Sequence, residues 1–133
     1  MGNINSINSI NVIAMKKINF ENMQNFIKGK NIIINTLTEK EQECLIQGTI
    51  NILDEVKILN ECLNNSKDRD IIIYGKNCND EKLFSKYKQL IDLGFTNVYI
   101  YIGGLFEWLL LQDIYGDENF PTTSKELDIL KYK

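Results

Sequence analysis

Short runs of apolar, β-branched residues alternate along this chain with segments in which apolar residues recur at helical spacing. The runs at 31–36 and 71–74 are apolar on both sides, which is typical of central strands in a parallel sheet. Strands are predicted, in chain order, at residues 15–18, 31–36, 49–51, 71–74 and 97–101, the third being the weakest. The helical spacing predicts helices over residues 20–29, 54–64, 80–93 and 105–115.

Local signals mark several ends of these elements. Asn19 is placed to cap the first helix, and Thr38 with Glu41 has the spacing of a capping box at a short helical turn. Gly94 suits the left-handed position that ends the third helix. Strands and helices that alternate in this way imply a mainly parallel sheet with helices on both faces.

Length and composition fit one domain with a sizeable core. Of 133 residues, 44% are hydrophobic and 25% charged, and the net charge of −3 gives no basic footprint for nucleic acid. No apolar run approaches the roughly 20 residues needed to span a bilayer, and the first residues lack the pattern of a secretory signal. We therefore expect a cytoplasmic protein without a transmembrane segment, with a flexible tail (1–14), a domain (15–123) and a second tail (124–133).

The residue types that are missing exclude several kinds of chemistry. The chain contains no histidine, which excludes Ser–His and Cys–His catalysis and most zinc sites. It has neither a G-x-G-x-x-G motif nor a Walker loop. We therefore expect no metal and no cofactor.

The three cysteines are odd in number and none is spaced as C-x-x-C, so a reducing compartment is expected. Cys62 lies with Val56 and Leu59 on one apolar side of a predicted helix, and we interpret it as a core residue. Cys44 follows an acidic stretch and could be exposed, and it is assigned no role. Cys78 lies in a polar loop and is a candidate for chemistry.

Residues 70–108 carry a distinctive order of motifs. The strand Ile71–Tyr74 is followed by a polar loop at 75–80, then a helix ending in Gly94-Phe95, then a strand, and then Gly103-Gly104 shortly before Trp108. This stretch resembles the second half of a rhodanese-like domain, the sulfurtransferase fold that one family of cell-cycle phosphatases also uses. A weaker match in the first half extends the resemblance to residues 15–123. The resemblance implies a three-layer α/β/α fold with a mainly parallel, five-stranded sheet.

The chain departs from the family where the chemistry is expected. The family has its nucleophilic cysteine at the first position of the loop, and this chain has Gly75 there, with Cys78 three residues later. The related phosphatases also use an arginine at the end of the loop, where this chain has Glu81. Phosphatase activity is therefore not expected, because nothing in the loop supplies the bidentate phosphate contact.

The candidate site is the loop itself, formed by Gly75, Lys76, Asn77, Asn79 and Asp80, together with Cys78. Its backbone N–H groups and the following helix N-terminus would form a cradle for a small sulfur-containing anion. Lys76 is either an anion contact or a solvated side chain, and Asn79 and Asp80 are more readily explained as helix caps than as catalysts. Gly75 is expected to fit a turn with positive φ.

Cys78 has two interpretations. Beside a helix N-terminus and Lys76 it could be nucleophilic and carry a sulfane sulfur as a persulfide. Alternatively it points away from the loop as an exposed thiol, since a shift of three positions displaces the nucleophile by several ångströms. If the protein is an enzyme, it is a sulfurtransferase of the rhodanese type.

The sequence is therefore compatible with three functions. The first is a divergent rhodanese-like domain that binds a small anion or a protein partner at the 75–80 loop, and the second is an active sulfurtransferase using Cys78. The third is a homodimer formed through the apolar final helix. Alternatively, residues 120–123 and the last residues of the chain fold over that helix, and we favour this alternative. The first six residues also fit a myristoylation motif at Gly2, which would give only reversible membrane association.

Overall fold

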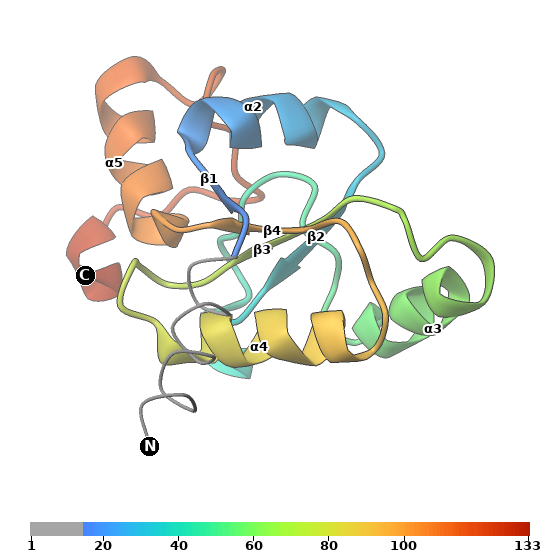
Figure 1. Cartoon of the computed structure of the whole chain (residues 1–133). Helices are drawn as coiled ribbons and strands as arrows, with labels where there is room; N and C mark the ends of the chain where they lie inside the picture. Colours follow the sequence, from blue (N-terminus) through green and yellow to red (C-terminus); the bar gives the residue numbers. More distant parts are fainter. Residues whose placement is uncertain (1–14) are drawn as a thin grey trace, which may run out of the picture.

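Four parallel strands form the sheet in the computed structural model, which describes residues 15–133 (Figure 1). They lie in the order β1-β4-β3-β2, and all neighbours are parallel. The strands are β1 (Lys17–Ile18), β2 (Ile32–Asn35), β3 (Ile71–Tyr74) and β4 (Val98–Tyr101). The tail at 1–14 and the motif at Gly2 lie outside the described residues.

The expected fifth strand is reduced to a single bridge within the described residues. Thr49 pairs in parallel with Ile33, and the N–H of Ile50 donates to the carbonyl of Ile33 at 2.9 Å. The chain then turns away, because the side chain and the carbonyl of Asn51 accept the N–H groups of Leu53 and Asp54. The prediction of a five-stranded sheet is therefore wrong: within residues 15–133 the sheet has four strands, and residues 49–51 contribute only the bridge at Thr49.

Each helix begins or ends at a residue that satisfies its free backbone groups. The helices are α2 (Phe20–Lys28), α3 (Glu55–Asn65), α4 (Glu81–Asp92) and α5 (Gly104–Tyr115), with 3₁₀ turns η1 (Glu39–Glu41) and η2 (Ile129–Tyr132). Asn19 caps α2 and exchanges hydrogen bonds with Asn22. Thr38 and Glu41 form the predicted capping box at η1. Gly94 has a φ of 108° after the last turn of α4, as predicted.

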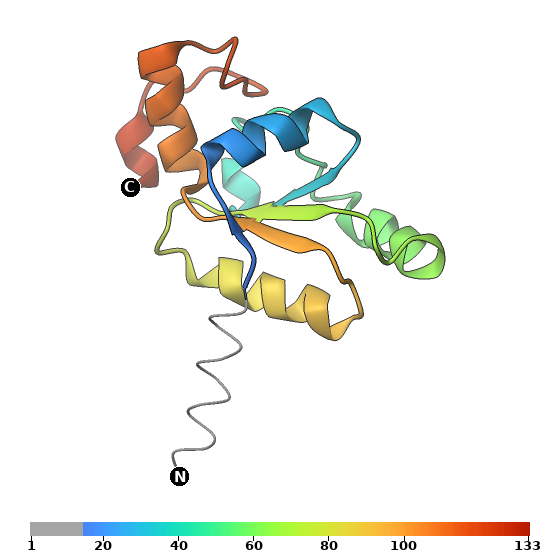
Figure 2. The ribbon, with the colours of Figure 1, turned by 45° about the horizontal axis from the view of Figure 1, so that its top comes forward.

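The side chains of the strands alternate between two apolar layers. Ile33, Ile72 and Tyr101 belong to the core beneath α2 and α5, whereas Ile73 and Ile100 belong to the core that α3 and α4 cover. Figure 2 shows α2 and α5 on one side of the sheet and α4 on the other, with α3 to the side. The three-layer α/β/α arrangement predicted from the sequence is confirmed.

The contribution of α3 to its layer is smaller than expected. Leu59 and Cys62 are buried, but Val56, which the spacing placed beside them, is 69% exposed. Figure 1 shows α3 to one side of the sheet. Ile58 packs against the core beside Leu59 and Cys62. Glu55 pairs with Lys86 of α4, so Val56 lies on the outer side of the helix. The prediction that Val56 faces the core is therefore wrong.

Residues 117–133 fold back over α5. The indole N–H of Trp108 donates to the carbonyl of Pro121 at 3.1 Å, and the Gln112 amide donates to the carbonyl of Phe120 at 2.8 Å. Phe120 and Tyr132 are both buried. This agrees with the expectation that these residues cover the final helix. No helix within residues 15–133 has the length and apolar character needed to cross a membrane.

Candidate functional site

The carboxyl ends of three neighbouring strands bring the candidate loop together with two other segments. Residues 75–80 connect β3 to α4, Thr36 follows β2, and Gly103 and Gly104 follow β4. The N–H groups of Leu105 and Phe106 donate to the carbonyls of Gly75 and Lys76, both at 2.9 Å. The first turn of α5 therefore holds the start of the loop.

Gly104 is required by this contact. Its φ is +69°, and a Cβ there would lie 2.7 Å from the carbonyl oxygen of Gly75. Gly104 therefore lets the backbone of α5 approach the backbone of the loop directly.

Gly75 is required for a different reason than the one predicted. It does not have a positive φ, so that expectation is wrong. A Cβ on Gly75 would lie 2.4 Å from Oδ2 of Asp80 and 2.8 Å from Oγ1 of Thr36. The absence of a side chain at residue 75 makes room for the Asp80 carboxylate.

The Asp80 carboxylate occupies the cradle that the sequence suggested for an anion. Its Oδ2 accepts the hydroxyl of Thr36 at 3.0 Å and the backbone N–H of Lys76 at 3.2 Å. Its Oδ1 accepts the N–H of Lys82 at 3.1 Å, so the same side chain caps α4, as predicted. A carboxylate at a helix N-terminus is favoured by the helix dipole. The chain thus places a negative charge of its own in the loop.

Asn77 ties the loop to the far end of the described chain. Its Nδ2 donates to the carbonyl of Tyr132 at 2.8 Å, and its Oδ1 accepts the N–H of Asn79 at 2.9 Å. Asn79 itself is exposed. Neither Thr36 nor Tyr132 was predicted from the sequence to belong to the site. Thr36 could have been found, because it follows a strand whose carboxyl end lies at the same edge, but no local signal marks Tyr132.

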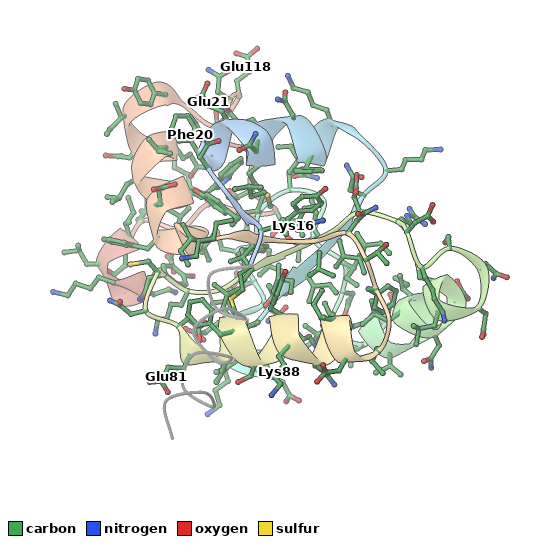
Figure 3. The ribbon with its side chains drawn as sticks, in the orientation of Figure 1. Lys16, Phe20, Glu21, Glu81, Lys88 and Glu118 are labelled. Carbon is green, nitrogen blue, oxygen red and sulfur yellow. The ribbon has the colours of Figure 1, made fainter. Side chains whose placement is uncertain are left out.

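A surface hollow of about 560 Å³ opens beside the loop. Its lining combines both signs of charge and includes Glu41, Lys76, Asp80, Glu81, Lys82 and Lys133. Figure 3 shows Glu81 on the outer side of the first turn of α4.

One ion pair crosses this hollow. Lys76 Nζ lies 3.5 Å from Glu41 Oε2. Partial burial tends to raise the pKa of Glu41, but hydrogen bonds from Thr38 and the charge of Lys76 outweigh it and lower that pKa.

The three cysteines differ in accessibility. Cys78 is exposed, and its thiol makes no hydrogen bond within residues 15–133. Cys62 is buried, as predicted. Cys44 is also buried, because residues after Phe120 cover it, and its Sγ donates to the carbonyl of Ser124 at 3.3 Å. Burial raises the pKa of the Cys44 thiol.

The comparison with protein families identifies the domain. The rhodanese-like domain matches residues 19–111, about seven tenths of the chain. The chain belongs to the rhodanese-like domain family.

One solved structure agrees with this fold, and a second match is weaker. The Alr3790 protein from Anabaena sp. has a TM-score of 0.56 and 21% identity, and 86% of each chain is covered. The Rhodanese_3-like domain of the same Anabaena protein has 26% identity and a TM-score of 0.48, covering 69% of this chain and 97% of that one. The search of curated proteins found no match.

For a rhodanese-like domain, the geometry of this loop limits the chemistry available to it. The first loop position offers no side chain, and the space beside it holds the Asp80 carboxylate instead of a thiol. The one cysteine in the loop, Cys78, lies on its exposed side. Among residues 15–133 no group of three or more potential ligands could hold a metal ion.

Proposed function

We propose that this rhodanese-like domain is a divergent member that binds a protein partner through the hollow beside the 75–80 loop, without sulfur transfer at the first loop position. The observation that carries this proposal is the Asp80 carboxylate, held by Thr36 and by the Lys76 N–H in the space where the family resemblance implies a cysteine side chain. A nucleophile at residue 75 is sterically incompatible with that arrangement.

A protein partner is favoured over a small sulfur-containing anion. An anion entering the loop would compete with the Asp80 carboxylate for the N–H groups of Lys76 and Lys82, and it would be repelled by that carboxylate. The rim of the hollow instead carries charges of both signs, including Glu81, Lys82 and Lys133. Mixed charges on a rim suit a polypeptide surface with its own acidic and basic side chains.

The binding surface is tested by site-specific photo-crosslinking in cells of the source organism. A photo-crosslinking amino acid at Asn79, on the exposed side of the loop, is compared with the same group at Lys88, on the outer side of α4 (Figure 3). We expect a discrete crosslinked polypeptide from position 79 only, which then binds the purified domain. Identical crosslinks from both positions, or none from position 79, would contradict the proposal.

A second candidate is a sulfurtransferase that uses Cys78, favoured by one observation: Cys78 is exposed and lies in the same loop. Its thiolate would attack the sulfane sulfur of thiosulfate, the S–S bond would break, and sulfite would leave with the electron pair. Cyanide would then take the sulfane sulfur as thiocyanate and regenerate the thiolate.

Activity assays separate the two candidates. The wild type and Cys78→Ser are assayed for thiocyanate formation, and mass spectrometry checks for a persulfide on the wild type. We expect no thiocyanate above the protein-free background and no persulfide. Turnover and a persulfide that are both lost in Cys78→Ser would establish the sulfurtransferase instead.

A further inference from the structure

We propose that residues 121–133 form a strap that opens and closes over the flank of the 75–80 loop, with Tyr132 as its latch. The strap would regulate the proposed partner-binding site, and this inference rests on the proposed function only in taking the 75–80 loop to be the functional surface.

The first end of the strap is firmly attached. The N–H of Gln47 donates to the carbonyl of Pro121 at 3.0 Å, and the N–H of Thr123 donates to the carbonyl of Leu45 at 2.8 Å. Just before it, the buried ring of Phe120 packs edge-on against Trp108 at 5.0 Å between centroids. Backbone pairing and an aromatic anchor together make this end part of the core.

The middle of the strap is poorly packed. Leu127 and Leu130 are 83% and 61% exposed, so these apolar side chains contribute little burial. A hollow of about 500 Å³ separates this part from the outer end of α5, and another of about 100 Å³ lies between it and Cys44. Segments with few buried apolar contacts open locally at low free energy.

The second end is held by η2, with Tyr132 as its one fully buried side chain and Ile129 partly buried against the same core. Tyr132 is 1% exposed and belongs to the same core cluster as Cys44 and Tyr74. Its backbone carbonyl accepts the Nδ2 hydrogen bond from Asn77, within the candidate loop. When Tyr132 leaves the core, Asn77 loses this partner, so closure of the strap and order in the loop are coupled.

The cysteines provide a built-in signature of the open state. Cys44 lies under the strap, donates to the carbonyl of Ser124 and lines the smaller hollow with Tyr132. Cys62 lies in the core layer on the other side of the sheet. An opening limited to the strap therefore exposes Cys44 and leaves Cys62 protected, whereas global unfolding exposes both.

The test measures alkylation of each cysteine by N-ethylmaleimide, resolved by peptide mass spectrometry on the full chain. We expect Tyr132→Ala to raise the Cys44 rate at least about tenfold while the Cys62 rate stays unchanged. Tyr132→Phe is the matched control, because it keeps the ring and the backbone carbonyl, and it should behave as wild type.

Hydrogen exchange tests the coupling to the loop. Asn77→Asp keeps an oxygen for the Asn79 N–H but removes the donor to Tyr132. We expect faster amide exchange in both residues 77–79 and 129–132, with exchange in β3 unchanged. Faster exchange in the loop alone would refute the coupling.

Two outcomes would overturn the strap itself. One is a Cys44 rate in Tyr132→Ala that matches wild type, and the other is an equal acceleration of Cys44 and Cys62. If Tyr132→Ala does not fold, the wild type decides: Cys44 must react faster than Cys62 in the absence of denaturant. These readouts involve no partner and no sulfur transfer, so the strap and the proposed function can fail independently.

Discussion

Replacing Gly75 by alanine puts a methyl group into the space that the Asp80 carboxylate fills. The added Cβ would lie 2.4 Å from Asp80 Oδ2 and 2.8 Å from Thr36 Oγ1, and neither atom is free to move without breaking a hydrogen bond. Overpacking typically costs about 1–3 kcal/mol, and a lost hydrogen bond to a charged group about 1.5–3 kcal/mol. Since part of the loop can shift, we expect Gly75→Ala to lower the free energy of unfolding by about 2–3 kcal/mol.

The assay is equilibrium unfolding in urea, combined with a double-mutant cycle. Asp80→Ala alone removes the cap of α4 and should cost about 0.5–2 kcal/mol. Once the carboxylate is gone, the 2.4 Å contact is removed and the Thr36 hydroxyl has no acceptor holding it towards residue 75. The double variant should therefore cost at least about 1 kcal/mol less than the sum of the single changes. The control pair is Gly75→Ala with Asn79→Ala, whose effects should add, because Asn79 is exposed in the same loop.

Two results would refute this prediction. Gly75→Ala could be as stable as wild type, or its loss of unfolding free energy could add fully to that of Asp80→Ala. Either result would mean that Asp80 does not occupy the space beside residue 75 in solution. The loop would then be open to an external anion, and the preference for a protein partner would lose its basis.

Three further outcomes follow from other parts of the molecule. Asn19→Ala should destabilise the domain by about 0.5–2 kcal/mol in urea unfolding, since Asn19 and Asn22 cap α2 reciprocally; no change would mean that the cap is frayed. The pKa of Glu41 is lowered from 4.5 because Thr38 hydrogen bonds and a nearby lysine outweigh its burial, so its stabilisation is full above pH 4.5 and is lost as the pH falls through the lowered value. Glu41→Gln should therefore flatten the acid limb of a stability–pH curve, and parallel curves would contradict this. Ile114 is 69% exposed on α5, where it would lie in a dimer interface formed by that helix. We expect no such dimer, so Ile114→Lys should leave the elution volume in gel filtration unchanged. A shift from dimer to monomer would support the homodimer instead.

Much of the fold could be predicted from the sequence because its signals are local. The run 31–36 is apolar on both sides, and Ile32–Asn35 is buried throughout as a central strand requires. Asn19 and Gly94 satisfy backbone groups within one turn of their own helices. Neither the loss of the fifth strand nor the exposure of Val56 could be predicted. The first depends on where the chain turns after Thr49, and the second on which side of α3 packs against the core and α4.

The candidate site was located by its motif, but its internal contacts were not predicted. The sequence shows that Gly75 departs from the family. The reason a side chain is excluded at this position is steric contact with Asp80 and Thr36, and Thr36 is 39 residues away from Gly75 in the chain. The tie between Asn77 and Tyr132 spans 55 residues. Neither contact leaves a periodic or compositional trace in the sequence.

The fit between Gly75 and Asp80 also constrains how this protein can change over evolutionary time. A cysteine introduced at residue 75 meets the Asp80 carboxylate, and loss of Asp80 alone uncaps α4 and leaves the Thr36 hydroxyl and the Lys76 N–H without their acceptor. Each single change therefore lowers stability, whereas the two changes together remove the clash between residue 75 and the carboxylate. A cysteine at residue 75 is compatible with a stable loop only when Asp80 changes as well.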